Sequence, residues 1–284
     1  MDIAVLGMGR MGQAVARRLL GGGHSVVVWN RSPGQADEVV AAGAKEAGSI
    51  AEAVDGAGVV ITSLSNSEAV EAVALGDGGV RSAIGADAVY ADASTVSPAM
   101  SERLASAFPR FVAMPILGAP AAVESGKATY LAGGDPAIVA RLEPLLAALT
   151  TTVRRYDRPA KAGHAKLASN LMLLAEVAAL AEAMTVARSG GLGDDEIRAL
   201  LGESPMLAPG VRNRFDGVLT GEMEAWWTTA LGAKDAGLAA GAARAAGVEL
   251  PLAELVAALY RKAAESGGAD EDIIAVAALY RSGG

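Results

Sequence analysis

The sequence contains no cysteine and only two histidines, His24 and His164. Without cysteine, the chain can form no disulfide, no thiolate nucleophile and no cysteine-ligated metal site. The two histidines lie far apart in the sequence, so a histidine metal cluster is excluded and we expect no metal. Aromatic residues make up 4% of the chain and hydrophobic residues 52%, a composition typical of closely packed, helix-rich layers.

Positive charge is also in deficit. The chain has 24 Lys and Arg residues against 32 Asp and Glu, a net charge of −8, which argues against nucleic acid as a partner. We find no uninterrupted apolar run long enough to span a bilayer, and Met1 leads directly into the first predicted strand without room for a signal peptide. We therefore expect a cytoplasmic protein with no membrane partner.

The first 32 residues carry the most informative pattern. An apolar segment at 3–6 runs into Gly7-x-Gly9-x-x-Gly12, a helical segment follows at 13–20, and a second apolar segment covers 26–29. This is a βαβ unit with a dinucleotide fingerprint, in which the glycines permit a tight turn, close approach of a pyrophosphate and close helix packing. The alternative is a purely structural Gly-rich turn. The predicted cofactor-binding loop comprises Gly7, Met8, Gly9, Arg10, Met11 and Gly12.

The end of the second strand indicates which dinucleotide binds. An acidic residue there would accept hydrogen bonds from a ribose 2′-hydroxyl and favour NAD. This chain has Asn30, followed by Arg31 and Ser32. A guanidinium and a hydroxyl suit a 2′-phosphate, so we predict that NADP(H) is preferred over NAD. The alternative for Arg31 is a solvated loop charge.

Two later strands deliver polar residues to the same edge of the predicted sheet. Segment 58–64 ends at Ser65, and segment 88–92 leads into Ser94, Thr95 and Ser97. Ligands bind at the carboxyl edge of such sheets, so these hydroxyls are candidates for contact with nicotinamide ribose or substrate. Ser97 or Thr95 can equally cap the next helix, with Pro98 at its first position.

The patterning becomes almost wholly helical after residue 163. We predict an α/β fold, with a Rossmann domain at 1–160 and an all-α substrate and dimerisation domain at 161–284, joined by a long helix at 166–188. Residues 116–120 are expected to form a loop. Further helices are expected at 136–149, 194–201, 223–231, 234–246, 253–266 and 270–281.

Lys166 is the first candidate for catalysis. It stands in the first turn of the predicted long helix, near the domain boundary, and Asn170 follows at i+4 on the same face. An ammonium and a carboxamide in a cleft can hold a substrate oxygen and pass it a proton. The alternative is a lysine that snorkels from a surface helix.

Five motifs occur in the order found in β-hydroxyacid dehydrogenases, a family that includes 3-hydroxyisobutyrate dehydrogenase and glyoxylate/succinic semialdehyde reductase, and is related to 6-phosphogluconate dehydrogenase. The resemblance covers essentially the whole chain. It implies a Rossmann domain, an all-α domain, a long interdomain helix, and a homodimer or homotetramer. The motifs are Gly7-x-Gly9-x-x-Gly12, Val28-Trp29-Asn30-Arg31-Ser32, Asp92-Ala-Ser94-Thr95-Val96-Ser97-Pro98, Lys166-Leu-Ala-Ser-Asn170 and Lys234-Asp235.

The resemblance implies a role for each matching position. Lys166 matches the lysine that protonates the carbonyl oxygen as hydride arrives, and Asn170 matches the asparagine that orients substrate. Asp235 is interpreted as a helix-starting residue only. The matching cofactor positions are Ser94 and Thr95 at the nicotinamide ribose, Leu64 and Ser65 over the adenine-side ribose and phosphates, and Lys234, which reaches cofactor or substrate.

The chain departs from the family in the segment that binds the substrate carboxylate. Leu117 replaces the usual serine, which leaves the backbone N–H groups of Gly118 and Ala119 as the expected donors. The side chains of Trp226, Trp227 and Met206 could line a more apolar pocket, although core packing is the simpler interpretation of them. The departures bear on the substrate more than on the reaction.

The leading hypothesis is an NADPH-dependent oxidoreductase acting on a small aldehyde, keto acid or β-hydroxyacid. One alternative is an imine reductase-like enzyme with a more apolar substrate, against which Lys166 argues. The other is a non-catalytic NADPH-binding module, against which the intact Lys166/Asn170 pair argues.

Overall fold

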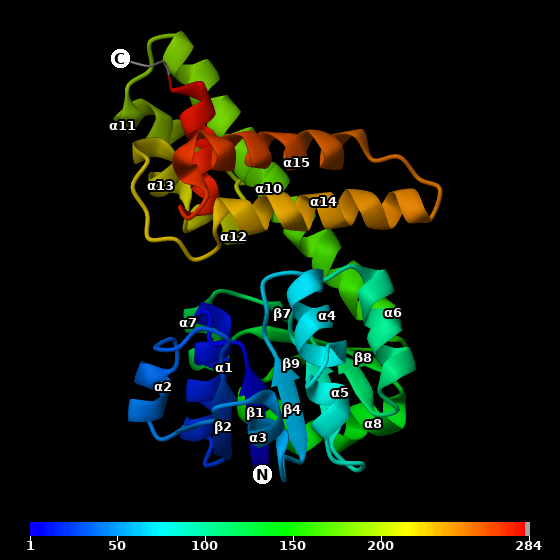
Figure 1. The fold of residues 1–284 in the computed structure, drawn as a ribbon. Helices are drawn as coiled ribbons and strands as arrows, with labels where there is room; N and C mark the ends of the chain where they lie inside the picture. The colour runs from blue at the N-terminus through cyan, green and yellow to red at the C-terminus, as the bar shows by residue number, and fades with distance from the viewer. Residues whose placement is uncertain (282–284) are drawn as a thin grey trace. The chain divides into compact units, whose positions relative to one another are not determined.

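The computed structural model describes residues 1–281 and divides into two compact units, Met1–Lys166 and Leu167–Gly284. The division falls inside helix α10 (Pro159–Ser189), which contributes residues to both units. Figure 1 shows the order of the elements along the chain.

Unit 1 is built on one sheet, which has nine strands among the described residues, in the order β3-β2-β1-β4-β5-β6-β8-β7, with β9 pairing with β8. The six strands from β3 to β6 are parallel, whereas β8 runs antiparallel to β6 and β7. The strands are β1 (Asp2–Leu6), β2 (Ser25–Trp29), β3 (Lys45–Glu46), β4 (Val59–Thr62), β5 (Val89–Asp92), β6 (Phe111–Ala113), β7 (Ile116–Leu117), β8 (Thr129–Gly134) and β9 (Thr152–Tyr156).

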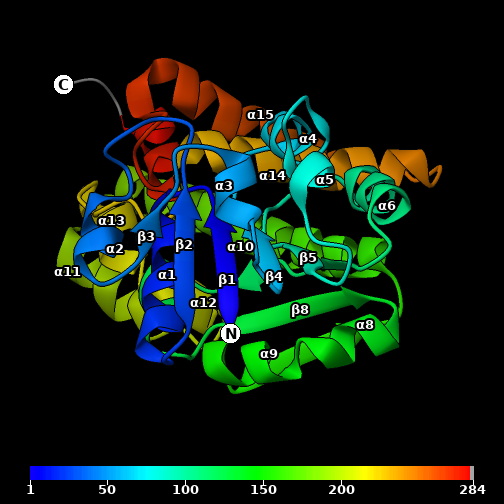
Figure 2. The ribbon, with the colours of Figure 1, turned by 60° about the horizontal axis from the view of Figure 1, so that its bottom comes forward.

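The strand order reverses between β1 and β4, which lie side by side at the centre of the sheet (Figure 2). In a doubly wound sheet, the loops at the carboxyl ends of such strands diverge and leave room for a ligand. The segments after β1, β4 and β5 are those in which the sequence predicts the cofactor site.

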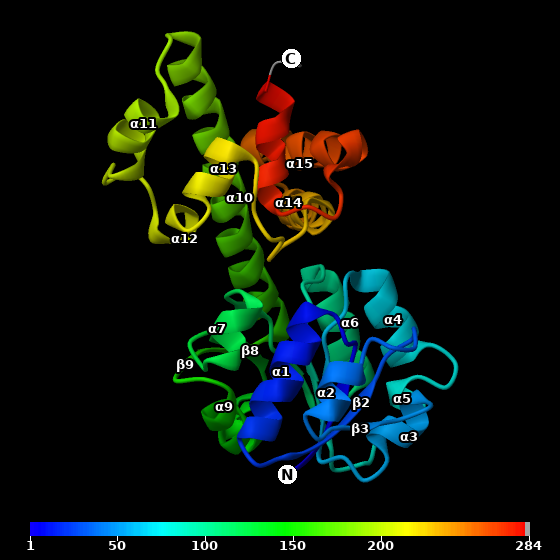
Figure 3. The same ribbon diagram turned by 90° about the vertical axis from the view of Figure 1, so that its left-hand side faces the viewer.

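Helices cover both faces of this sheet because its strands are apolar on both sides. Ile3 and Val5 of β1 belong to one buried cluster, while Ala4 and Leu6 belong to the other. Figure 3 shows the two helical layers. The first cluster includes residues of α1 (Arg10–Gly21), α2 (Asp37–Ala41), α7 (Pro120–Glu124), α8 (Pro136–Arg141) and α9 (Glu143–Leu149), and the second those of α3 (Ile50–Val54), α4 (Ser67–Leu75), α5 (Val80–Ala83) and α6 (Pro98–Ala107).

Unit 2 is helical, and its core forms around the second part of α10. Leu174, Val177 and Met184 are buried there, and α14 and α15 lie antiparallel beside each other (Figure 1). Its elements are α11 (Asp194–Ile197), η1 (Arg198–Gly202), α12 (Pro209–Arg212), α13 (Phe215–Thr220), α14 (Thr229–Ala245), α15 (Pro251–Ala263), η2 (Ala264–Gly268) and η3 (Ile273–Tyr280). The predicted fold class, a Rossmann domain followed by an all-α domain, is confirmed.

Helix α10 differs from the sequence-based expectation in two ways. It begins at Pro159 rather than near Lys166, because proline fits the first turn of a helix, where its missing N–H is not needed. By length and composition it could also cross a membrane, although no such segment was expected. Its apolar character has a packing explanation, since Leu174 and Val177 are fully buried in unit 2.

Three other predicted elements are wrong. The helix expected at 136–149 is divided into α8 and α9, and Pro144, which lacks an N–H, stands in the first turn of α9. Ile116, expected in a loop, pairs with Tyr130 as part of β7. Residues 221–227 are not helical, and α14 begins only at Thr229. The backbone N–H groups of Trp226 and Trp227 donate to the side chain of Asp272, which lies more than forty positions away in the sequence.

Candidate functional site

The glycine-rich loop after β1 has the geometry of a phosphate cradle. Gly7 has φ +100°, and a Cβ there would overlap the carbonyl oxygen of Ser63. A Cβ at Gly12 would overlap the carbonyl oxygen of Gly7, whereas a Cβ at Gly9 would meet no atom within 4 Å. The fold therefore requires glycine at positions 7 and 12. At Gly9, in contrast, the absent side chain leaves open space where a pyrophosphate can approach.

The open space adjoins the N-terminus of α1. Gly9 is the N-cap and makes no side-chain cap hydrogen bond, and the first turn contains no acidic residue. The N–H groups of Arg10 and Met11 stand in that first turn, where helix geometry provides no backbone acceptor. Together with the positive end of the helix dipole, they fit a bound phosphate.

Met8 is placed differently from the other residues of the loop. Its side chain is fully buried, and its N–H donates to Oδ1 of Asn30 at 2.9 Å. The carboxamide of Asn30 also donates from Nδ2 to the carbonyl oxygen of Ser32 at 2.9 Å. Arg31 and Ser32 are exposed, so a cation and a hydroxyl follow the end of β2.

The loops after β4 and β5 are joined to this cradle. The N–H of Leu64 donates to Oγ of Ser94 at 2.9 Å, and the Leu64 side chain packs against the space beside Gly7. Ser65 is exposed next to it. The cap of α6 is Ser97, whose Oγ accepts the N–H of Met100 at 3.1 Å. The capping role considered for this hydroxyl cluster thus belongs to Ser97.

Lys166 lines a small cavity of about 10 Å³ together with the predicted cofactor residues Ser94 and Thr95. Its Nζ donates to the carbonyl oxygen of Ile116 at 2.6 Å, and the residue is half-buried. The side chain is therefore directed to the sheet edge at β7 and does not snorkel into solvent. The other residues that line the cavity are Asp92, Val96, Ser101, Ala113, Pro115 and Gly163.

The predicted carboxylate-binding segment follows Ile116 directly. Leu117 is half-buried and packs against the cluster that includes α3 to α6. Gly118 is exposed, with φ +141°, and Ala119 is the N-cap of α7. The hydrogen bond from Lys166 to Ile116 thus ties the candidate proton donor to the backbone that precedes this segment.

Asp92 is a site residue that the sequence reasoning quoted only as part of a motif. Its carboxylate is buried and accepts from Oγ1 of Thr62 at 2.8 Å. The phenol of Tyr90 lies 3.0 Å from that Oγ1. Tyr90 donates in this bond, because the single proton of the Thr62 hydroxyl goes to Asp92. Burial and, secondarily, the nearby Asp92 charge raise the pKa of Tyr90. The available signal was an acidic residue at the end of a buried strand.

In unit 2, the predicted site residues Asn170 and Lys234 both contact the carboxylate of Asp235. Nδ2 of Asn170 donates to Oδ2 of Asp235 at 2.7 Å, and Nζ of Lys234 lies 2.9 Å from Oδ1 of Asp235. Asn170 is 6% and Asp235 3% exposed. A carboxylate only accepts hydrogen bonds, so Asp235 fixes which end of the Asn170 amide faces it. The interpretation of Asp235 as a helix-starting residue is wrong, because α14 begins at Thr229 with Thr228 as its N-cap.

The aromatic residues considered for the substrate pocket have local partners in unit 2. The guanidinium carbon of Arg214 lies 5.2 Å from the centre of the Trp226 ring, and Trp227 packs against the buried cluster of this unit. Met206 is 87% exposed. For Trp227 the core-packing interpretation is confirmed.

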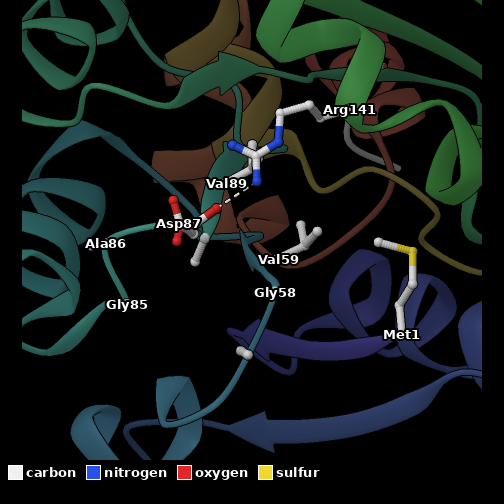
Figure 4. A pocket seen from close by; sticks show the side chains of 10 residues that line it. Met1, Gly58, Val59, Gly85, Ala86, Asp87, Val89 and Arg141 are labelled. Atoms are coloured by element: carbon white, nitrogen blue, oxygen red, sulfur yellow. Dashed lines mark hydrogen bonds between the residues drawn. The ribbon is translucent and has the colours of Figure 1, made fainter.

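A larger hollow of about 520 Å³ lies at the amino ends of the parallel strands, away from the carboxyl ends that carry the predicted cofactor residues (Figure 4). It adjoins the amino ends of β1, β4 and β5, where Met1, Gly58 and Ala88 stand. Arg141 lines it and donates to the carbonyl oxygen of Asp87 at 2.7 Å. No predicted site residue lies there. Among residues 1–281, no group of three or more His, Asp or Glu side chains is placed to hold a metal ion.

Two family models match nearly the whole chain. The NAD-binding domain of 6-phosphogluconate dehydrogenase matches residues 2–157. The NAD-binding domain of NADP-dependent 3-hydroxyisobutyrate dehydrogenase matches residues 160–280. The chain belongs to the β-hydroxyacid dehydrogenase family. It is thereby placed among NAD(P)-dependent oxidoreductases of the hydroxyacid dehydrogenase type, as the sequence motifs predicted.

Individual members of the family support this placement over full length. The NAD-dependent L-serine dehydrogenase of Pseudomonas aeruginosa is 31% identical over 290 residues, covering 98% of this chain and 97% of that protein. The crystal structure of 3-hydroxyisobutyrate dehydrogenase from Salmonella typhimurium matches with a TM-score of 0.89 at 26% identity, covering 98% and 99% of the two chains. A structure of Psf3 in complex with NADP+ and 2-OPP has a TM-score of 0.87 at 25% identity, covering 98% and 99%.

Proposed function

We propose that this β-hydroxyacid dehydrogenase homologue is an NADPH-dependent oxidoreductase acting between a small aldehyde or keto acid and the corresponding alcohol. The observation that carries the proposal is the position of Lys166. Lys166 lines the same cavity as Ser94 and Thr95, and its ammonium is held by the carbonyl oxygen of Ile116 at 2.6 Å. A proton donor is thereby kept beside the hydroxyls that the family resemblance assigns to the nicotinamide ribose.

In the proposed reduction, Lys166 donates a proton from Nζ to the carbonyl oxygen of the substrate, and in the reverse direction it accepts that proton. The nicotinamide supplies the hydride when bound. Asn170, whose amide orientation is fixed by Asp235, orients the substrate. The phosphates enter the open space at Gly9 and accept hydrogen bonds from the first-turn N–H groups of α1.

The preference for NADPH over NADH is proposed from the end of β2. Asn30 stands where a carboxylate would repel a 2′-phosphate, and exposed Arg31 and Ser32 offer charge and hydrogen bonds to it. The NADP+ complex of Psf3 supports a nicotinamide cofactor at this fold, whereas the L-serine dehydrogenase relative is NAD-dependent by name. Because these relatives use different cofactors, the proposed preference for NADPH rests on residues 30–32 of this chain.

The substrate side is proposed to bind a small carboxylate through the backbone N–H groups of Gly118 and Ala119, because Leu117 has no hydroxyl to offer. The half-buried Leu117 side chain also favours a second candidate, reduction of an imine on a more apolar substrate. A steady-state assay of NADPH and NADH oxidation distinguishes them, with small aldehydes, keto acids and a cyclic imine as substrates. We expect turnover with a carbonyl compound and NADPH. Turnover of the imine alone, or of nothing in the panel, would contradict the proposal.

We further propose that the chain forms a homodimer or homotetramer through α10. Met172 and Val186 are 66% and 71% exposed, and Ala179 and Ala183 are exposed between them. These residues recur at nearly whole helical turns and make an apolar stripe. Light scattering after size exclusion should give a mass above one chain for the wild type and a monomer mass for Met172→Glu/Val186→Glu. A monomeric wild type would overturn this.

A further inference from the structure

Two carboxamides hold the peptide groups of Met8 from both sides. Oδ1 of Asn30 accepts the Met8 N–H at 2.9 Å, and Nε2 of Gln13 donates to the Met8 carbonyl oxygen at 3.0 Å. Met8 stands between Gly7 and Gly9 of the phosphate cradle. Both hydrogen-bonding groups of this residue are thus used by side chains from outside the loop.

The same two carboxamides also hold the segment that follows β2. Nδ2 of Asn30 donates to the carbonyl oxygen of Ser32 at 2.9 Å, and Nε2 of Gln13 donates to the carbonyl oxygen of Gln35 at 3.1 Å. Arg31 lies between Asn30 and the Ser32 carbonyl oxygen that Asn30 holds, and Gln13 holds the same segment three residues further on, at Gln35. Each carboxamide therefore connects the loop proposed for the pyrophosphate to the loop proposed for the 2′-phosphate.

The orientation of each amide is fixed by its partners. Both terminal nitrogens of Arg17 lie 3.3 Å from Oε1 of Gln13, and because a guanidinium only donates, Nε2 must face the two carbonyl oxygens. Oδ1 of Asn30 must likewise face the Met8 N–H. Arg17 is itself held by Glu38 and Glu124 at 3.2 and 3.0 Å. The arrangement is a connected network in which each of the bonds has a defined donor.

We propose that Gln13 and Asn30 are positioning residues that hold the glycine-rich loop and the Arg31–Ser32 loop in one fixed geometry, so that losing either weakens NADPH and NADH alike. The proposal rests on the proposed cofactor function of the two loops. The positioning role adds two points to that cofactor function. Asn30 acts whether or not the cofactor carries a 2′-phosphate, and Gln13, which has no other assigned role in the site, takes part in cofactor binding.

The test measures dissociation constants for NADPH and NADH with Gln13→Met, Asn30→Ala and Arg31→Ala. Gln13→Met keeps the length of the side chain and removes the donor. We expect Gln13→Met and Asn30→Ala to weaken both cofactors by the same factor, roughly five- to thirty-fold, with kcat at saturating cofactor unchanged. Arg31→Ala should weaken NADPH only.

A substitution at the neighbouring residue Gln35 serves as the control. Gln35→Ala removes a side chain of the same segment but keeps the carbonyl oxygen that Gln13 uses, so both affinities should stay at the wild-type level. Unchanged affinities in Gln13→Met and Asn30→Ala, or a loss confined to NADPH, would overturn the positioning role. Equal effects of Arg31→Ala on both cofactors would instead contradict the proposed NADPH preference and leave the positioning role supported.

Discussion

Single side chains in this site owe their orientation to partners that are distant in the sequence. Lys166 is directed by the carbonyl oxygen of Ile116, and Asn170 is directed by the carboxylate of Asp235. Charge-assisted hydrogen bonds are short and directional, so each holds its functional group in one position before any ligand binds. A mutation of a partner should therefore act on catalysis through the residue that it holds.

Replacing Asp235 tests this at the residue scale. In Asp235→Ala the amide of Asn170 loses its acceptor at 2.7 Å and becomes free to rotate. We expect kcat/KM for the substrate to fall roughly ten- to hundred-fold, the effect of losing a hydrogen bond to a charged group, with the dissociation constant for NADPH nearly unchanged. Asp270→Asn, an exposed acid of the same unit, is the control. An unaltered kcat/KM in Asp235→Ala would contradict the positioning of Asn170.

At the scale of elements, the turn between β1 and α1 is where sequence and structure agree most closely. Gly7 and Gly12 have the roles that their spacing predicts, because those roles depend only on neighbouring backbone. The cap of α6 is Ser97, one of the two hydroxyls that the sequence offered for it, since a cap is a local interaction. Local patterns can be read from the sequence when the interacting groups are a few residues apart.

A pair of alanine substitutions separates ligand contact from packing in this turn. Gly9→Ala adds a Cβ that meets no protein atom within 4 Å, so we expect normal thermal stability without cofactor but severely weakened NADPH binding. Gly12→Ala places a Cβ against the carbonyl oxygen of Gly7 and should lower the melting temperature of the cofactor-free protein. Thermal melts with and without NADPH check both. Tight NADPH binding by Gly9→Ala would show that no phosphate approaches the loop there.

The segment 221–228 illustrates what the sequence could not reveal. A helix was predicted over 223–231, but the N–H groups of Trp226 and Trp227 donate to Oδ2 of Asp272 at 2.9 and 3.1 Å. Oδ1 of the same carboxylate pairs with Nε of Arg214 at 2.9 Å. A fully buried acid more than forty positions away thus determines the local backbone, and no periodicity in the segment encodes it.

Asp272→Ala should consequently destabilise unit 2. Arg214 is 6% exposed in its side chain and would lose its buried counter-ion, which typically costs about 3–5 kcal/mol. Denaturant unfolding followed by tryptophan fluorescence reports on this region through Trp226 and Trp227. Glu71→Ala removes an exposed ion pair with Arg103 and should cost no more than about 1 kcal/mol. Equal costs for the two variants would mean that the buried pair contributes no more than a surface one.

At the scale of the whole molecule, the sequence was sufficient for the fold class and the family but not for every site residue. The alternation of apolar strands and helices, followed by wholly helical patterning, predicts the Rossmann and all-α units. Asp92 was quoted only within a motif and Asp235 was misjudged as a helix start, because their importance lies in contacts with Thr62 and Asn170. The substrate could not be predicted from the family motifs, because Leu117 stands where the family has the serine that binds the substrate carboxylate.

The central claim is that Lys166 transfers the proton while the Rossmann unit binds the cofactor independently of it. The most direct test compares wild type and Lys166→Met, which retains side-chain length without the ammonium, in NADPH oxidation with the best carbonyl substrate and in NADPH binding. We predict that turnover falls by roughly 10²- to 10⁴-fold, while the dissociation constant for NADPH stays within about two-fold of wild type, since Nζ bonds the carbonyl of Ile116 and not the phosphate cradle. Undiminished turnover in Lys166→Met would contradict the claim.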